Sequence, residues 1–151
     1  MSELVYAFLV VATCVVIHTT SLVWCGRLLV KHRDAIDEKL NAITQSGVLI
    51  GVCVFIVILH VVETAVWAVF FWYKDLFPNF ETALYFSMGS YTTIGYGDVV
   101  LPQKWRLLGA VEGLSGVLLC GLSAAFVFAL VNALFEMRNS SQKSQNKDSA
   151  S

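Results

Sequence analysis

The sequence predicts an all-α membrane protein in which three helices cross the bilayer and a shorter helix and loop enter it from one side. Apolar stretches cover residues 4–30, 47–73 and 107–135, and each is longer than the roughly 20 helical residues that cross a hydrocarbon core of about 30 Å. Of the 151 residues, 57% are hydrophobic and 14% are charged, and the mean hydropathy is +0.70. This balance is typical of a small membrane protein and not of a soluble domain.

The first apolar stretch is predicted to be a membrane anchor and not a cleaved secretory signal. Its start carries Glu3 where a signal peptide has Lys or Arg. The apolar run is also too long for a signal core, and no small-x-small cleavage site follows it. Residues 1–31 are therefore interpreted as an additional N-terminal transmembrane helix.

Two polar segments separate or follow the apolar stretches. Residues 32–45 carry charges of both signs, and Ile36, Leu40 and Ile43 have approximately helical spacing. Either an amphipathic interfacial helix or a solvated connector fits this pattern. Residues 138–151 consist mainly of Ser, Gln, Asn and Lys, so the sequence predicts a disordered tail there.

The basic residues predict which side of the membrane each loop faces, because cytoplasmic loops carry an excess of Lys and Arg. Lys104 and Arg106 lie on one side, beside the re-entrant loop. The larger group flanks the first connection and follows the last apolar stretch, and it consists of Arg27, Lys31, Arg33, Lys39, Arg138, Lys143 and Lys147. The sequence therefore predicts an N-terminus outside the cell and a cytoplasmic C-terminus.

The stretch before the third apolar segment predicts a short helix over residues 80–91. The pair Phe77-Pro78 stops the preceding helix, and Asn79 suits the N-cap position of the new one. The C-terminal, negative end of this helix would then precede the glycine-containing run that follows.

That run reads YTTIGYGD over residues 91–98. Gly95 and Gly97 flank Tyr96 and allow backbone conformations that are closed to residues with a Cβ. A K⁺ ion that leaves water needs replacement oxygens, and backbone carbonyls that face a narrow axis supply them. The run resembles the selectivity filter of tetrameric potassium channels, and it departs from the commonest family sequence, TVGYGD, only by the β-branched Ile94. The resemblance covers about residues 46–135.

The resemblance implies a K⁺-selective pore made by four identical chains. Residues 46–137 would form the pore domain, with an outer helix, a pore helix, the filter and an inner helix. The sequence has one filter and no internal repeat, so a fourfold pore needs four copies of the chain. K⁺ would bind at Thr93, Ile94, Gly95 and Tyr96, with Gly97 completing the filter, and no cofactor besides these ions is implied.

Several residues are candidates for filter support. Family members often place paired aromatic residues and a pore-helix glutamate behind the filter, whereas this sequence has Gly89 at the position of the glutamate. Asp98 then needs another partner, which Tyr85 or Trp105 could provide. The full set of support candidates is Thr92, Asp98, Tyr85, Phe86, Trp105, Glu112 and Glu63.

Ionisable residues inside the apolar stretches are costly in a bilayer and usually face the protein interior. His60 and Glu63 lie three residues apart and share a helix face, while Glu112 lies in the third stretch. One hypothesis is that Glu112, together with Glu63, replaces the missing pore-helix carboxylate. The alternative is an ordinary interhelical hydrogen bond. His60 and Glu63 alone provide too few ligands for a metal site.

The third apolar stretch resembles the inner helix of the family. Gly116 and Gly121 match its glycine hinge region, although close helix packing is the simpler use of glycine here. Helical spacing places Gly121, Ala125 and Phe128 on one face. Phe128 is therefore a candidate for a hydrophobic gate.

Other function classes lack support in the sequence. It shows no nucleophile and base constellation, no phosphate-cradling glycine loop and no basic nucleic-acid patch, so neither an enzyme nor a nucleic-acid-binding protein is expected. It also shows no voltage-sensor pattern and no soluble ligand domain. Cys14, Cys25, Cys53 and Cys120 lie in or near the spans without paired spacing, which favours free thiols.

Three alternatives to a K⁺ channel fit the sequence less well. A potassium uptake transporter resembles four fused repeats, whereas this chain has one. A regulatory subunit would not need a complete filter, and a weakly selective cation channel usually shows changes at the position of Gly95-Tyr96-Gly97. The expected partners are membrane lipid, K⁺ and further copies of the chain. The compact chain, without a sequon on its outward loops, fits the inner (plasma) membrane of a prokaryote.

Overall fold

The computed structural model describes residues 2–32 and 42–148, with side chains described within 3–32 and 43–138. Its elements, in chain order, are α1 (Ser2–Lys31), α3 (Ala42–Tyr73), α4 (Phe80–Tyr91), the 3-10 helix η1 (Gln103–Trp105) and α5 (Arg106–Asp148). No strand occurs within these described ranges. The predicted all-α fold class is therefore confirmed.

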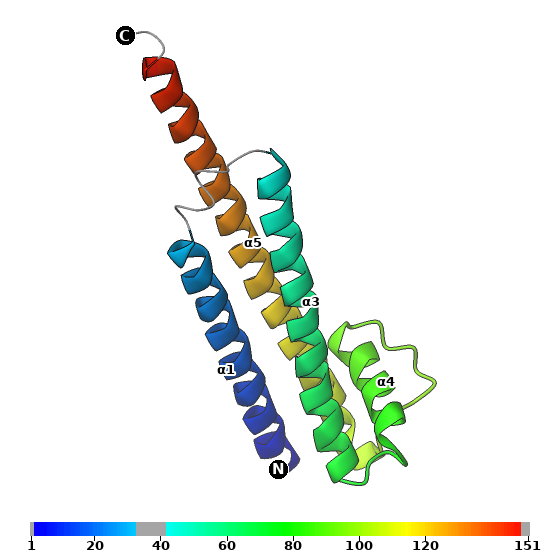
Figure 1. Ribbon diagram of the computed structural model, residues 1–151. Coiled ribbons are helices and arrows are strands. Elements are labelled where there is room, and N and C mark those ends of the chain that lie inside the picture. Colours follow the sequence, from blue (N-terminus) through cyan, green and yellow to red (C-terminus); the bar gives the residue numbers. More distant parts are fainter. Residues whose placement is uncertain (1, 33–41, 149–151) are drawn as a thin grey trace.

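Three helical segments are long and apolar enough to cross a membrane, as the sequence predicts. They are Glu3–Lys31, Ile43–Tyr73 and Gln103–Arg138. Figure 1 shows α1, α3 and α5 running side by side, with the N-terminus at one end of the bundle and the C-terminus at the other. The short helix α4 lies beside α3, at the end of the bundle that carries the N-terminus. The protein is thus an integral membrane protein with a re-entrant segment.

The second spanning helix starts earlier than predicted. The sequence places its apolar stretch at residues 47–73, whereas α3 begins at Ala42. Buried Gln45 belongs to this first part of the helix, and its Nε2 donates a hydrogen bond to the carbonyl of Leu134 on α5 at 3.1 Å. This tertiary contact explains why polar residues are included in the helix. The rest of the predicted connector, residues 33–41, lies outside the described residues.

The last helix also extends further than predicted. α5 continues to Asp148, where the sequence analysis expected a disordered tail from residue 138. A helix that is already nucleated grows by adding one hydrogen bond per residue, and Gln and Lys have good helix propensity. The helix therefore continues beyond residue 137, where the sequence predicts the pore domain to end. Residues 149–151 of the tail lie outside the described part of the chain.

A tight turn joins α3 to α4. The Leu76 amide donates to the carbonyl of Phe71 at 3.1 Å, and Asp75 adopts a positive φ of 53°. Asn79 then caps α4, because its side-chain oxygen accepts a hydrogen bond from the Thr82 amide at 2.8 Å. The predicted bounds and the predicted cap of this helix are both confirmed.

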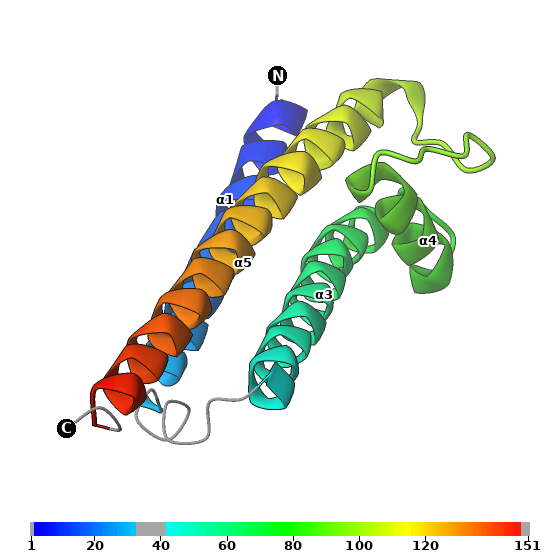
Figure 2. The same ribbon diagram turned by 90° about the horizontal axis from the view of Figure 1, so that it is seen from above.

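Aromatic packing holds α4 against the end of α3. The Phe71 ring lies 6.1 Å from that of Phe77 and 5.5 Å from that of Phe86, and the last two rings are 5.0 Å apart. Phe71 is fully buried. Aromatic pairs at these centroid distances add about 0.5–1.5 kcal/mol each beyond their area burial. Figure 2 shows α4 beside the end of α3 from a second direction.

Glycines on α5 let α4 approach its backbone. A Cβ built on Gly116 would lie 2.1 Å from the carbonyl oxygen of Tyr91, and one on Gly113 would lie 3.0 Å from that of Ser90. At Gly109 a Cβ would lie 3.2 Å from the Phe86 ring. Small residues allow such contact between helices. The C-terminal end of α4 is therefore fixed directly against α5.

Candidate functional site

The filter segment, defined here as residues 92–98, starts where α4 ends. Three backbone hydrogen bonds turn the chain back along the last turn of α4. The Thr92 amide donates to the Met88 carbonyl at 3.2 Å, and the Thr93 amide donates to the Ser90 carbonyl at 3.0 Å. The Gly95 amide donates to the Gly89 carbonyl, also at 3.0 Å. The packing of α4 thereby sets the starting position of the filter segment.

Every second residue of the central filter segment has a left-handed backbone. The φ angles are 61° at Thr93, 53° at Gly95 and 81° at Gly97, whereas Ile94 and Tyr96 do not have positive φ. Alternation of left-handed and right-handed residues is the backbone pattern that turns successive N–H groups to one side, and the positive φ values at Thr93, Gly95 and Gly97 fit this pattern. A left-handed threonine is strained by about 1–3 kcal/mol, and such strain is concentrated at functional sites.

The filter segment is not covered by the rest of its own chain. All residues from 92 to 98 are exposed, with Ile94 exposed to 58% and Tyr96 to 68%. The segment nevertheless follows α4 and lies in sequence between α3 and α5, two helices that are long enough to span a bilayer. At membrane depth, irregular backbone that is exposed in this way must be covered by protein or line water.

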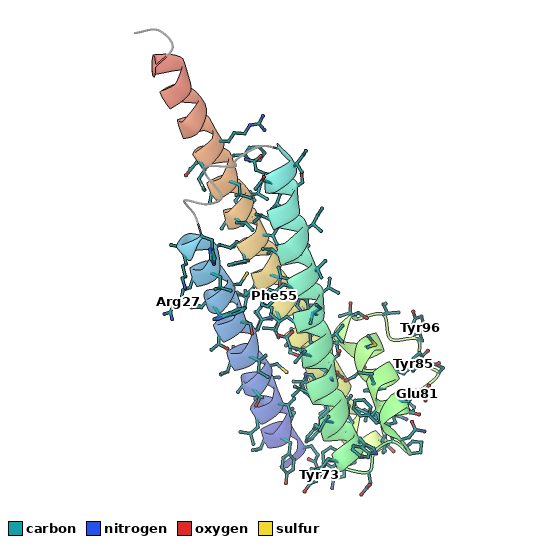
Figure 3. The ribbon with its side chains drawn as sticks, viewed as in Figure 1. Arg27, Phe55, Tyr73, Glu81, Tyr85 and Tyr96 are labelled. Carbon is teal, nitrogen blue, oxygen red and sulfur yellow. The ribbon has the colours of Figure 1, made fainter. Side chains whose placement is uncertain are left out.

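Tyr85 connects α4 to the far end of the filter segment. Its hydroxyl donates a hydrogen bond to Oδ2 of Asp98 at 2.8 Å, and its ring stacks on that of Tyr96, with centroids 6.1 Å apart and an interplanar angle of 13°. Figure 3 shows Tyr85 and Tyr96 together on the side of α4 that faces away from α1. The hydrogen bond to Asp98 raises the pKa of Tyr85, because the carboxylate favours the protonated phenol.

The other two aromatic candidates, Phe86 and Trp105, do not lie beside Asp98 as Tyr85 does. Phe86 points into the core between α3, α4 and α5, so it supports the filter only through α4. Trp105, on η1, packs at the edge of the same core, and Tyr85 is the residue that bonds Asp98. Thr92 caps α4, with its Oγ1 donating to the Met88 carbonyl at 2.6 Å.

Glu112 contacts α4 from the side of α5. The Ser87 hydroxyl donates a hydrogen bond to Oε1 of Glu112, and both side chains are fully buried. The other carboxyl oxygen, Oε2, has no hydrogen-bond partner among the described residues. Glu112 therefore contacts the middle of the pore helix, and Asp98 is bonded by a different residue.

Glu63 is the centre of a second polar contact with α4. The Tyr91 hydroxyl donates to Oε2 of Glu63, and Nδ1 of His60 lies 3.0 Å from the same oxygen. The other oxygen, Oε1, lies 2.8 Å from Nδ1 of His18 on α1. Glu63 is fully buried, and its contacts therefore join α1, α3 and α4 inside the bundle.

His18 is the main residue that the sequence analysis missed. It is fully buried, and Ser123 Oγ on α5 lies 3.3 Å from its Nε2. The signal that singled out His60 and Glu63, an ionisable side chain within an apolar stretch, applies equally to His18. Together with His60 and Glu63 it forms a group of three side chains, found among the residues that the structure describes, whose ligand atoms lie close enough together to hold a metal ion.

The hinge and gate candidates differ in their surroundings. Gly116 is buried against the backbone of Tyr91, whereas a Cβ on Gly121 would have no atom of its own chain within 4 Å. Ala125 and Phe128 are exposed on α5, Phe128 to 68%. Gly116 is thus a packing glycine, and the face that carries the other three candidates is left uncovered by its own chain.

A comparison with models of protein families matched residues 56–133, more than half of the chain, to a family described as "Ion channel". The matched range begins within α3, includes α4 and the filter segment, and ends within α5. It leaves α1 outside. No curated protein and no solved structure matched the chain.

Proposed function

Because the chain belongs to the ion channel family, we propose that four copies form a pore that conducts K⁺ passively and selectively across the membrane. The filter segment carries this proposal. It contains TTIGYGD, and left-handed residues alternate along it at Thr93, Gly95 and Gly97. Backbone carbonyls turned to one side are the ligands that replace the hydration shell of K⁺. As an ion channel, the protein is not an enzyme.

The exposure of the filter segment in a single chain supports assembly into a tetramer. Irregular backbone at membrane depth is tolerated only where protein covers it or where it lines water, and the filter segment is exposed in one chain. Thr93 and Gly95 also line an open groove of about 460 Å³ together with Gly113, Leu114 and Val117 of α5. Neighbouring copies around a fourfold axis would fill this groove and close the filter.

The ion pathway follows from the same arrangement. The C-terminal end of α4 precedes the filter segment, and the negative end of its dipole favours a cation next to the filter. Thr93, Ile94, Gly95 and Tyr96 are the proposed K⁺ ligands. Gly121, Ala125 and Phe128 are the proposed pore-lining face of α5, because this face is exposed in one chain.

The test is ion flux into liposomes that contain the purified full-length protein. We expect K⁺ flux well above Na⁺ flux, and we expect Gly95→Ala to abolish it because φ at this position is +53°. The matched control is Gly51→Ala, since a Cβ there meets no atom within 4 Å and the position is helical. Equal K⁺ and Na⁺ flux would indicate a weakly selective cation channel instead.

The same experiment tests the number of chains. When parent and Gly95→Ala chains are mixed equally before assembly, a tetramer in which every chain must be intact retains about one sixteenth of the flux. A loss of only half would contradict a shared filter. Absence of flux from the parent protein alone, with flux restored by another channel subunit, would support the regulatory-subunit alternative.

A further inference from the structure

Helix α1 lies outside residues 56–133, the part of the chain that matches the ion channel family. Its buried residues nevertheless pack against both α3 and α5, and it runs beside them along the bundle (Figure 1). Near its middle lies His18, which is fully buried. An ionisable side chain inside a membrane span is costly and commonly has a function. The partners of His18 therefore indicate what α1 contributes to the pore.

The His18 ring is held at both of its nitrogen atoms. Nδ1 lies 2.8 Å from Oε1 of Glu63 on α3, and Nε2 lies 3.3 Å from Oγ of Ser123 on α5. All three side chains are buried. An ionised carboxylate only accepts hydrogen bonds, so Nδ1 of His18 donates to Oε1 of Glu63. One imidazole ring thereby joins α1 to both of the other spanning helices.

The second carboxylate oxygen of Glu63, Oε2, is shared by Tyr91 and His60. The Tyr91 hydroxyl donates to Oε2, and Nδ1 of His60 lies 3.0 Å from Oε2 and 2.9 Å from the Tyr91 oxygen. Because the hydroxyl proton goes to the carboxylate, the Tyr91 oxygen faces His60 with a lone pair, and the Nδ1 proton of His60 is shared between the two oxygens. Hydrogen bonds to a charged acceptor are the stronger kind. Glu63 therefore fixes the Tyr91 hydroxyl.

The two oxygens of the Glu63 carboxylate thus connect different helices. Oε1 is held by α1 through His18, and Oε2 holds α4 through Tyr91. A carboxylate is planar and turns as a unit, so the direction of Oε2 depends on what holds Oε1. Loss of the His18 donor would leave a buried, charged oxygen unpaired. The carboxylate would then turn toward other donors and release Tyr91 from its position.

Tyr91 is the last residue of α4, and the filter segment begins at the next residue. Its side chain is buried, and its carbonyl oxygen faces Gly116 of α5, where a Cβ would lie 2.1 Å away. The Gly95 amide of the filter segment donates to the Gly89 carbonyl, in the last turn of α4, at 3.0 Å. A displacement of Tyr91 would therefore displace the turn to which the filter segment is bonded.

We propose that His18 is a positioning residue for the filter segment, because it holds the carboxylate of Glu63, which in turn fixes Tyr91 and the end of α4. The role of α1 is then to complete the support of the filter from outside the family-matched part of the chain. The alternative is that His18 only joins three helices. An effect on K⁺ selectivity rests on the proposed function, whereas an effect on the filter backbone does not.

Hydrogen–deuterium exchange, measured by mass spectrometry on full-length protein in detergent, tests this role without any flux. His18→Leu keeps a side chain of similar size and removes the donor to Glu63. The amides of residues 92–98 should then exchange about 2- to 30-fold faster than in the parent. His18→Asn keeps an N–H donor near the position of Nδ1, and it should restore most of the protection.

Tyr91→Phe shows whether His18 acts through Tyr91. This variant lacks the hydroxyl that donates to Glu63, so it should itself speed exchange of residues 92–98. In the Tyr91→Phe background, His18→Leu should then add little further. The matched control is His32→Leu, which is the same change at an exposed histidine just after α1. The control should exchange like the parent.

Ion flux in liposomes gives a second measurement. A loss of folded protein lowers K⁺ and Na⁺ flux in proportion, whereas a displaced filter lowers the ratio of K⁺ to Na⁺ flux. We expect His18→Leu to lower this ratio and His18→Asn to restore it. A parent protein without selective flux would contradict the proposed function, and the exchange measurement would still decide the role of His18.

Two results would overturn the positioning role. One is unchanged exchange of residues 92–98 in His18→Leu protein that is folded, judged by its circular dichroism and its elution as an oligomer. The other is an equal effect of His18→Leu with and without Tyr91→Phe, since His18 would then not act through Tyr91. If His18→Leu does not fold, His18→Gln replaces it, because its amide lies near the position of Nε2 and away from Glu63.

Discussion

Two buried carboxylates, those of Glu63 and Glu112, contact the pore helix α4. Glu112 accepts a hydrogen bond from Ser87, and Glu63 accepts one from Tyr91, one turn further along α4. Ionisable side chains are costly in a bilayer, and each of these two is buried against α4. We propose that together they replace the carboxylate that is absent at Gly89, by holding α4 rather than by bonding Asp98.

A double-mutant cycle on Glu112 and Ser87 tests this role. Glu112→Ala and Ser87→Ala should each lower the thermal stability of the purified protein, and the double variant should be no worse than Glu112→Ala alone. The coupling free energy should be about 0.5–3 kcal/mol, as for residues in one hydrogen-bonded pair. Ser46→Ala, at an exposed position of α3, is the control. If the effects of Glu112→Ala and Ser87→Ala on stability were strictly additive, a direct stabilising contact between the two side chains would be contradicted.

Tyr85 is expected to stabilise the conducting filter. Tyr85→Phe keeps the ring that stacks on Tyr96 and removes the hydroxyl that bonds Asp98, so K⁺ flux in liposomes should decay faster with time. In the parent, a raised pKa keeps the bond at neutral pH, and the bond is lost only as the pH rises through that pKa. Tyr73→Phe, at an exposed ring on α3, should behave like the parent. If K⁺ flux decayed equally fast in Tyr85→Phe and Tyr73→Phe, the Tyr85 hydroxyl would have no role in stabilising the filter.

The packing of α4 on α5 decides the position of the filter segment. Gly109, Gly113 and Gly116 occur every three or four residues and therefore share one face of α5. A Cβ at each would meet an atom of α4 at 3.2 Å or less. The sequence allows two uses for Gly116, as a hinge or as a packing residue, and its contact with Tyr91 supports packing.

Gly116→Ala should therefore destabilise the protein. A Cβ at this position would lie 2.1 Å from the Tyr91 carbonyl oxygen. The backbone of α4 or α5 would have to move to relieve this clash. Overpacking of this kind lowers the free energy of unfolding by about 1–3 kcal/mol, measurable as a lower thermal midpoint in detergent. Gly121→Ala, on the same helix but without a close neighbour in its own chain, should unfold like the parent. Equal stability of the two variants would contradict the packing role.

The whole chain places its N-terminus and its re-entrant segment at the same end of the bundle (Figure 1). An ion pair of 3.3 Å between Glu3 and Lys104 joins α1 to η1 at that end. Basic residues favour the opposite end as cytoplasmic, with Arg27 and Lys31 on α1 and Arg138 on α5. We propose that the N-terminus and the mouth of the filter face outward.

Thiol labelling in intact cells tests this orientation. In a chain whose four native cysteines are replaced by serine, Glu81→Cys should react with a membrane-impermeant maleimide, because Glu81 is exposed at the start of α4. Arg138→Cys should react only after permeabilisation. The reverse pattern would show that the filter mouth faces the cytoplasm.

The sequence by itself determined the features that are encoded by contiguous residues. Spanning helices follow from the length of an apolar stretch, and the start of α4 follows from Asn79, whose cap bond forms within three residues. The family was also identifiable from one uninterrupted run at residues 91–98. The start of α3 and the C-terminal end of α5 escaped prediction, because polar residues there join helices that are nucleated and packed elsewhere.

Only the tertiary structure decided which side chains meet between helices. His18 and Glu63 are 45 residues apart, and Ser87 and Glu112 are 25 apart. Their contacts depend on how each helix is rotated about its axis. In soluble helices an apolar stripe reveals that rotation, but helices that are apolar all round carry no such stripe. The partners of the buried polar groups, among them the contacts of His18 and His60 with Glu63, and the glycine contacts with α4 therefore became visible only in the packed bundle.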